Sequence, residues 1–286
     1  MKVSGFTILR NGSKYEYPYI ESIKSVLPIC DEFIIVVGDS EDDTLQQIES
    51  LSEPKIKIFH TVWDENLRTG GKILAQQTDI ALSHITGDWG IYLQADEVIH
   101  EKYLATIQTA MHENFQAKEV EGLLLKYKHF YGSYDYVANS RNWYRREIRV
   151  IRNGIGVKSW QDAQGFRIDG RKMFVKAVDA YVYHYGWVRH PQVMQEKIKS
   201  FNKLWHDDKW IDKNIPEISE FDYTQIDLIE KFTETHPIVM TDRILKYNWS
   251  FIPPEDRKQK VKYRLLRFIE KKTGLRIGEY KNYKLI

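Results

Sequence analysis

Residues 3–93 alternate between short apolar runs and stretches with helical periodicity. The apolar runs have the length and composition of buried strands, and the helical stretches place apolar side chains three and four residues apart. A chain that repeats strand and helix in this way folds into a mostly parallel, doubly wound α/β sheet, whose ligands bind at the carboxyl ends of the strands. The expected strands are residues 3–9, 33–37, 56–59 and 89–93, and the expected helices are residues 20–27, 45–51 and 73–85.

The rest of the chain is less regular and divides the sequence into two parts. Strand patterns at residues 122–130 and 180–185 are followed by a helical pattern at residues 192–205. Beyond that helix the apolar periodicity weakens until a second amphipathic segment near the C-terminus. We therefore expect one α/β domain over residues 1–215 and a helical, basic C-terminal extension over residues 216–286.

The net charge of +2 conceals an uneven distribution along the chain. Residues 256–286 contain eleven Lys and Arg residues and three acids, so residues 1–255 are net acidic. An enzyme that works on nucleic acid spreads basic side chains over its working face, and we therefore expect no nucleic-acid partner. We expect the basic C-terminus to contact the anionic inner face of a membrane. The alternative is a packed helix whose lysines are solvated.

Three features bear on the cellular location. No apolar run approaches the roughly 20 residues that a membrane-spanning helix needs. The N-terminus carries one charge and a short apolar run without a small-residue cleavage site, unlike a secretory signal. Cys30 is the only cysteine, which excludes intramolecular disulfides and a metal site built on several thiolates. These features predict a cytoplasmic protein that is at most peripheral to a membrane.

The most informative segment is the turn, strand and acidic pair of residues 87–97. Asp96 and Glu97 directly follow the strand expected at residues 89–93, at the edge where ligands of such sheets bind. Carboxylates at this place suit Mn²⁺ or Mg²⁺, which keep phosphate oxygens and water as their other ligands. The alternative is a solvated acidic turn without a ligand.

Residues 87–97 resemble the Gly-Asp-Trp…Leu-Asp-x-Asp-Glu signature of glycosyltransferase family 2. Residues 7–11 resemble the first strand and Arg-Asn turn of that family, and residues 36–44 resemble its nucleotide loop. The resemblance implies a GT-A fold, which is a Rossmann-like α/β sheet, here followed by the helical C-terminal extension. It also implies that the acidic motif binds a nucleotide diphosphate through a metal.

The implied metal site departs from the family pattern at one position. Gln94 stands where the family has the first Asp of Asp-x-Asp, so metal binding rests on Asp96, together with Glu97. His184 begins a His-Tyr-Gly segment that several relatives carry, which implies a further metal ligand or a contact to phosphate. The alternative for His184 is a structural histidine held by hydrogen bonds.

The implied nucleotide site departs from the family at two positions. Gly38 takes the place of the leading Asp of the nucleotide loop, so Asp39 is expected to read the base. The family's Arg-Asn pair is missing at its usual place, which leaves Arg68 or Lys72 as cations for the diphosphate; the alternative for both is a solvated surface charge. The donor site that the resemblance implies is Ile8, Arg10, Asp39, Arg68, Lys72, Gln94, Ala95, Asp96 and Trp160.

The resemblance places the catalytic base in the second half of the chain. Asp162, within Trp160-Gln161-Asp162, falls where the family has its catalytic carboxylate, which removes the proton of the acceptor hydroxyl. Trp160 offers an indole surface for a sugar ring. Asp135 and Asp169 remain alternatives for the base.

The resemblance implies an inverting, hexosyltransferase-type enzyme that uses a UDP- or GDP-sugar and Mn²⁺ or Mg²⁺. Its expected acceptor is a saccharide or glycolipid in the synthesis of bacterial surface polysaccharide or lipopolysaccharide. One alternative is an inactive nucleotide-sugar-binding module, which Gln94 and Gly38 favour. Another is a sugar nucleotidyltransferase, which would need a loop richer in glycine and basic residues than residues 10–13 provide.

Overall fold

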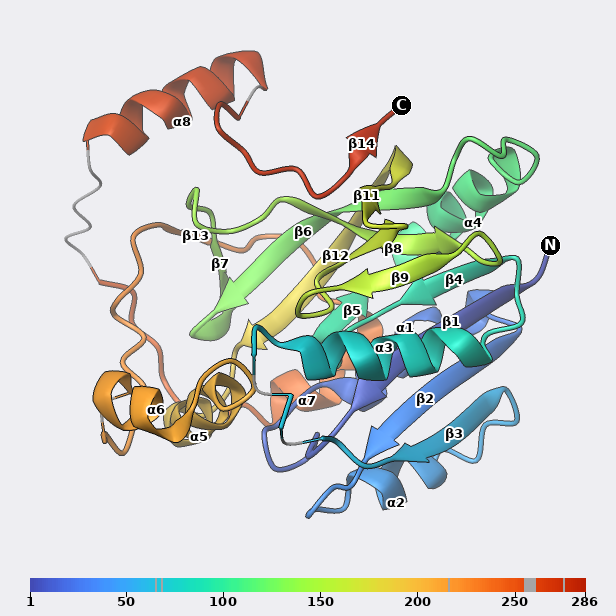
Figure 1. The fold of residues 1–286 in the computed structure, drawn as a ribbon. Helices are drawn as coiled ribbons and strands as arrows, with labels where there is room; N and C mark the ends of the chain where they lie inside the picture. Colours follow the sequence, from blue (N-terminus) through green and yellow to red (C-terminus); the bar gives the residue numbers. More distant parts are fainter. Residues whose placement is uncertain (65, 68, 216, 255–260, 275) are drawn as a thin grey trace.

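The computed structural model describes residues 1–286 except residues 65, 68, 216, 255–260 and 275 (Figure 1). Its centre is an eleven-stranded sheet. Strands β1, β2, β3 and β4 are parallel neighbours in the order β4-β1-β2-β3, so their carboxyl ends share one edge. This confirms the expected α/β fold. The strands are β1 (Val3–Leu9), β2 (Glu32–Gly38), β3 (Ile56–Thr61) and β4 (Trp89–Tyr92), and the intervening helices are α1 (Tyr19–Val26), α2 (Thr44–Glu49) and α3 (Lys72–His84).

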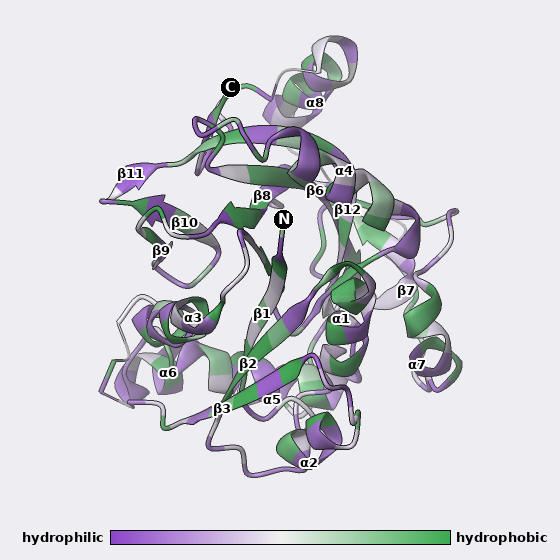
Figure 2. Ribbon diagram, turned by 90° about the vertical axis from the view of Figure 1, so that its right-hand side faces the viewer, coloured by the Kyte–Doolittle hydropathy of each residue, from purple (hydrophilic) through white to green (hydrophobic). Residues whose placement is uncertain are grey.

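Two apolar cores form on opposite faces of this sheet, as the alternation along β2 shows. Phe33 and Val37 pack on the side of α1, whereas Ile34 and Val36 pack on the side of α3. Successive side chains of a strand point to opposite faces, so a strand that is apolar throughout needs a cover on both. Figure 2 shows α1 and α3 on the two sides of β1 and β2. This sandwich holds the strand ends in place.

The second half of the chain extends the sheet beyond β4. Strand β8 pairs antiparallel with β4, β6 pairs antiparallel with β8, and β12 runs parallel to β6. The short strand β5 begins at Glu97, directly after Asp96, and pairs antiparallel with β12. The elements are β5 (Glu97–Ile99), α4 (Leu104–Glu113), β6 (Gly122–Tyr131), β7 (Ser133–Ala138), β8 (Arg146–Arg152), β9 (Val157–Trp160), β10 (Gly165–Ile168), β11 (Arg171–Lys172) and β12 (Phe174–Trp187).

The C-terminal part returns to the sheet twice. Strand β13 pairs with β7, and β14 pairs with β12. Arg145 also forms a two-bonded ion pair with Glu279, at 2.7 and 2.8 Å. None of the helices in the described ranges has the length and hydropathy to cross a bilayer. The elements are α5 (Pro191–Asn202), α6 (Asp208–Asn214), β13 (Ile229–Lys231), α7 (Thr241–Leu245), α8 (Val261–Thr273) and β14 (Lys284–Leu285).

Candidate active site

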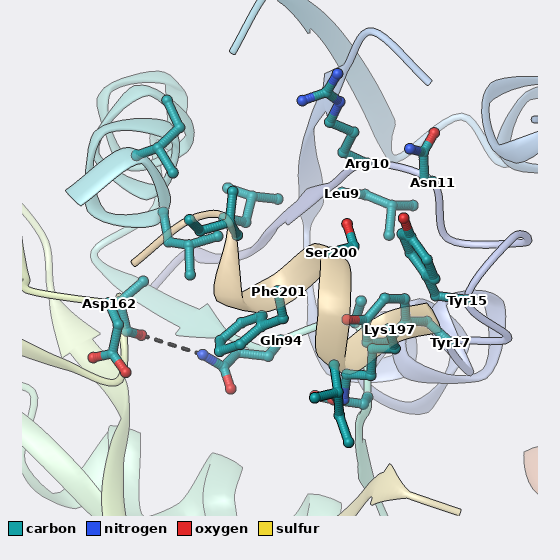
Figure 3. Close-up of a pocket in the computed structure, with 18 of the residues that line it drawn as sticks. Leu9, Arg10, Asn11, Tyr15, Tyr17, Gln94, Asp162, Lys197, Ser200 and Phe201 are labelled. Carbon is teal, nitrogen blue, oxygen red and sulfur yellow. Dashed lines mark hydrogen bonds and ion pairs between the residues drawn. The ribbon is translucent and has the colours of Figure 1, made fainter. Parts of the chain in front are cut away.

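The carboxyl ends of β1 and β4 open into a cavity of about 990 Å³. Helix α5 crosses this cavity, with Asp162 on one side and the segment of Tyr15 and Tyr17 on the other (Figure 3). Parallel strands bring their ends together here, as the sequence predicts. Of the expected site residues, Ile8, Arg10, Gln94, Ala95, Asp96, Asp162 and His184 line the cavity, whereas Asp39, Lys72, Glu97 and Trp160 do not. Arg68 lies outside the described residues.

Asp96 lies at the cavity floor among basic side chains. It is 8% exposed, with His184 Nε2 3.8 Å from Oδ1 and Lys197 Nζ 3.6 Å from Oδ2. Burial alone would raise the pKa of Asp96, but the charges of His184, Lys197 and Arg189 outweigh it and lower that pKa. Burial and Arg189 in turn lower the pKa of Lys197 to about 7. Asp96 is therefore a buried, ionised carboxylate beside His184 and Lys197.

Gly186 keeps the space between Asp96 and His184 open. A Cβ atom at this position would lie 2.6 Å from His184 Nε2 and 2.7 Å from Asp96 Oδ2. A carboxylate oxygen and an imidazole nitrogen suit Mn²⁺, and Mg²⁺ is commonly held by one or two protein ligands plus phosphate and water. No third His, Cys, Asp or Glu joins them within the described part of the chain. The donors therefore fit a cation that shares its shell with a bound diphosphate.

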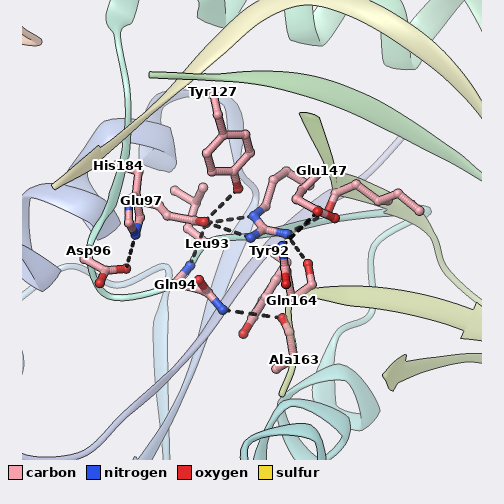
Figure 4. Close-up of polar contacts among 12 residues, drawn as sticks. Tyr92, Leu93, Gln94, Asp96, Glu97, Tyr127, Glu147, Ala163, Gln164 and His184 are labelled. Carbon is pink, nitrogen blue, oxygen red and sulfur yellow. Dashed lines mark hydrogen bonds and ion pairs between the residues drawn. The ribbon is translucent and has the colours of Figure 1, made fainter. Parts of the chain in front are cut away.

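Glu97 points toward Tyr127 and away from Asp96 (Figure 4), and it does not line the cavity. Its side chain is fully buried and accepts two bonds from Arg149, at 2.7 and 2.8 Å. It also accepts a 2.7 Å bond from the Tyr127 hydroxyl and a 3.1 Å bond from the Gln94 backbone N–H. Both carboxylate oxygens are thus occupied, which corrects the expectation that Glu97 shares a metal with Asp96. Consecutive residues at the start of a strand face opposite ways, so only one of the pair reaches the cavity.

His184 has a second histidine behind it. His184 on β12 is paired with His129 on β6, and their Nδ1 atoms are 3.1 Å apart. His129 Nε2 lies 2.7 Å from the Tyr144 carbonyl oxygen. Burial, followed by the neighbouring His184, holds the pKa of His129 well below its ordinary value, and burial also lowers the pKa of His184. Burial thus disfavours the charged form of both rings.

Asp162 occupies a tight turn between β9 and β10. The residues on either side, Gln161 and Ala163, have φ values of 54° and 62°, which non-glycine residues seldom adopt. Gln94 Nε2 donates a 3.5 Å bond to the Ala163 carbonyl oxygen and so connects this turn to the end of β4. Burial raises the pKa of Asp162, which makes its carboxylate a better proton acceptor. The turn thus presents a basic carboxylate to the cavity.

The two alternative bases are placed elsewhere. Asp135 lies on β7 and Asp169 lies in the turn between β10 and β11, and neither lines the cavity. Trp160 is 37% exposed and stacks under Arg167, whose guanidinium is 5.1 Å from the ring centroid. Lys72 is exposed at the start of α3. The structure therefore brings Asp162, but not Trp160 or Lys72, together with Asp96.

In the segment that resembles the nucleotide loop of the family, Gly38 leaves room for an indole. A Cβ atom at Gly38 would lie 2.4 Å from Trp63 Nε1, so an indole fills the place of a side chain. Arg10 Nε donates a 3.2 Å bond to the Asp39 carbonyl oxygen, and its guanidinium lies 5.7 Å from the Trp63 ring centroid. The Asp39 side chain is 51% exposed. Trp63 itself lines the cavity, beside Arg10.

Sequence reasoning missed several cavity residues because no motif marks them. Lys197 belongs to the predicted helix at residues 192–205, and its place beside Asp96 depends on how α5 packs. Trp63 follows β3 in a segment without a recognised pattern. Arg189 does not line the cavity, but it is fully buried with its guanidinium 4.6 Å from the Tyr17 ring centroid, and its charge helps to lower the pKa of Asp96. The only available signal was their proximity in sequence to predicted strand ends and to the His-Tyr-Gly segment.

Comparison with known proteins identifies the family. The family model described as "Glycosyl transferase family 2" matches residues 9–180. A comparison with curated proteins found no match. Among solved structures, the chain is similar to S. aureus TarS 1-349, at 19% identity and a TM-score of 0.42, over 70% of this chain and 64% of that chain.

Two further solved structures are similar to the chain. S. aureus TarS shows 20% identity and a TM-score of 0.44, over 70% of this chain and 39% of that chain. S. aureus TarS 1-349 in complex with UDP-GlcNAc shows 17% identity and a TM-score of 0.43, over 70% and 65%. The chain thus spans less than two thirds of each of these structures. Because the family model covers more than half of its residues, the chain belongs to glycosyl transferase family 2.

Proposed function

We propose that this protein is an inverting glycosyltransferase of the hexosyltransferase type. It transfers a sugar from a UDP- or GDP-sugar to a hydroxyl of a saccharide or glycolipid acceptor. One observation carries this proposal: Asp96 and His184 face a space kept open by Gly186, in the same cavity as Asp162. A diphosphate site and a proton acceptor in one cavity are the two elements that such a transfer needs.

The cavity residues divide the chemistry between them. Ile8 and Arg10 line the side that we assign to the nucleotide, where Asp39 contacts Arg10 from outside the cavity. Asp96 and His184 would hold Mn²⁺ or Mg²⁺. A bound cation would neutralise charge on the departing diphosphate. Asp162 accepts the proton of the acceptor hydroxyl while that oxygen bonds to the anomeric carbon. The bond from that carbon to the diphosphate breaks on the opposite face, which inverts the configuration.

We also propose a cytoplasmic protein that contacts the inner face of the membrane and acts in surface polysaccharide or lipopolysaccharide synthesis. Helix α8 supports the contact, because Leu265 and Phe268 are each 62% exposed on it and Lys262 and Arg264 are exposed beside them. Apolar and basic side chains together favour an anionic lipid surface. Residues 255–260, which precede this helix, lie outside the described residues. We further propose that residues 1–215 form the transferase domain and residues 216–286 a C-terminal extension, two strands of which join the central sheet.

A ligand screen tests the proposed activity. Thermal shifts with UDP- and GDP-sugars, with and without Mn²⁺, should show a stabilisation that depends on both ligands, because binding to the folded state raises its stability. Release of nucleoside diphosphate should then follow when saccharide acceptors are added. Stabilisation without any release, with every acceptor tested, would instead indicate a nucleotide-sugar-binding module. No stabilisation by any nucleotide sugar would contradict the proposal.

A further inference from the structure

His129 is a buried polar residue that the proposed transfer does not use. It is 3% exposed on β6 and does not line the cavity. Its ring is held in a fixed orientation by aromatic neighbours, with the Tyr144 ring perpendicular at a centroid distance of 4.5 Å and the Trp143 ring at 4.9 Å. Because the ring cannot turn, its two polar contacts determine which of its nitrogens carries hydrogen.

One assignment of donors and acceptors satisfies both hydrogen bonds of His129. The Tyr144 carbonyl oxygen can only accept, so His129 Nε2, at 2.7 Å, must carry the hydrogen. His129 is buried and its two polar contacts are a carbonyl oxygen and another imidazole, neither of which supplies a counter-charge, so a neutral ring fits this place. In a neutral ring the other nitrogen is an acceptor, and His129 Nδ1 receives the hydrogen of His184 Nδ1 across 3.1 Å. His184 Nε2 is thereby left unprotonated. That nitrogen is the one that faces Asp96.

We propose that His129 is a positioning residue that holds His184 in its Nδ1–H form, so that the Nε2 lone pair points into the space beside Asp96. This inference rests on the proposed cation site of Asp96 and His184. A ligating imidazole generally donates its other nitrogen's hydrogen to an acceptor, which sets the tautomer and orients the ring. Here a second imidazole takes the role that a carboxylate or carbonyl usually has.

The tautomers can be measured without any metal. Long-range ¹H–¹⁵N correlation spectra of protein labelled at its nine histidines should show His184 protonated at Nδ1 and His129 protonated at Nε2. Assignments come from the spectra of His129→Asn and His184→Ala. A metal-free protein in which His184 carries its hydrogen on Nε2, or in which both nitrogens of His129 are protonated, would overturn the proposal.

Cation affinity provides the second test, with variants that separate the acceptor from the ring. His129→Phe keeps an aromatic ring but offers no acceptor, and should weaken Mn²⁺ binding roughly 10- to 100-fold, the usual effect of losing an outer-shell partner. His129→Asn places an amide oxygen near the former Nδ1 and should retain affinity within a few-fold of the parent. Titration of Mn²⁺ in the presence of UDP measures both. His100→Phe, a change of another buried histidine, is the control and should leave Mn²⁺ affinity unchanged.

The outcomes distinguish this inference from the cation site on which it depends. His184→Ala should weaken Mn²⁺ binding at least as much as His129→Phe. If His184→Ala has no effect, the cation site itself is wrong, and the inference fails with it. If His184→Ala weakens binding but His129→Phe does not, only the role of His129 is refuted. Equal weakening by His129→Phe and His129→Asn, with melting temperatures like the parent's, would also refute it, since the acceptor would then be irrelevant.

Discussion

The two walls of the cavity hold their polar side chains in different ways. On the side proposed for the nucleotide, at the ends of β1 and β2, Arg10 lines the cavity and contacts Asp39, which lies outside it and is half exposed. On the other side, near β5 and β12, Asp96 and His184 line the cavity and are buried, and His129 on β6 is buried in contact with His184. Exposed polar groups can rearrange around a ligand at little cost in free energy. Removing the partner of a buried polar group destabilises the protein, because that group is left without a hydrogen bond. We therefore expect the buried wall to be the less tolerant of substitution.

Asp96→Asn should have the largest effect. The change removes the buried negative charge that the cation site depends on, so metal-dependent donor binding and transfer should both fall. Charge stabilisation by a cation contributes several kcal/mol, which corresponds to a loss of about 10³-fold or more in transfer. Donor titration in Mn²⁺ and single-turnover transfer measure the two effects. Asp39→Asn, on the exposed side, is the comparison and should lower donor affinity and transfer less than Asp96→Asn. An equal loss in both variants would remove the distinction between the two sides.

Asp162→Asn should separate chemistry from binding. Loss of a general base typically lowers the rate by about 10²- to 10⁴-fold, while donor affinity should stay within a few-fold of the parent. The same two assays on this variant give the comparison with Asp96→Asn. Near-parental transfer would show that Asp162 is not the base. Asp135 and Asp169 would then be the next residues to replace.

Gly186→Ala should narrow the space beside Asp96. The new Cβ atom would lie 2.6 Å from His184 Nε2, so the two proposed ligands must move apart. We expect Mn²⁺ affinity to fall by about tenfold, as for other disturbances next to a metal ligand. UDP binding measured without metal serves as the internal control and should change little. An alanine variant with parental Mn²⁺ affinity would show that the cation does not use this space.

Glu147, which lies on β8 and accepts a bond from Gln164, should make the stability of the folded protein depend on pH. Burial raises the pKa of Glu147 from 4.5 to about 8, so the folded protein keeps this carboxyl neutral. A group whose pKa rises on folding stabilises the folded state. This stabilisation is complete at a pH below the pKa of the unfolded state, and it is lost as the pH rises through the pKa of the folded state. The melting temperature of the parent should therefore fall between pH 4.5 and pH 8, more steeply than that of Glu147→Gln.

The size of this pH effect and its control follow from the same reasoning. A pKa that moves from 4.5 to about 8 corresponds to roughly 5 kcal/mol, and each kcal/mol to roughly 2–4 °C in a domain of this size, so a difference on the order of 10 °C is expected. Glu121 is the matched control, since Arg171 holds its carboxylate and its pKa is lowered despite burial. Glu121→Gln should leave the slope in this range unchanged. Parallel melting curves for the parent and Glu147→Gln across the range would contradict the prediction.

The sequence alone predicted the parallel sheet, its helices and the place of Asp96. These predictions succeed because apolar periodicity is local, and because a residue that follows a parallel strand necessarily lies at the ligand edge. The family also follows from local motifs, which the match to residues 9–180 confirms.

Only the tertiary structure decided what surrounds Asp96. Glu97, its neighbour in sequence, turns inward to Arg149, because strand geometry sends consecutive side chains to opposite faces and a buried cation there needs a partner. Lys197 and His129 come from other elements, and they reach Asp96 and His184 only through the packing of α5 and the register of β6 with β12. Such contacts join residues far apart in the chain, so no local pattern records them.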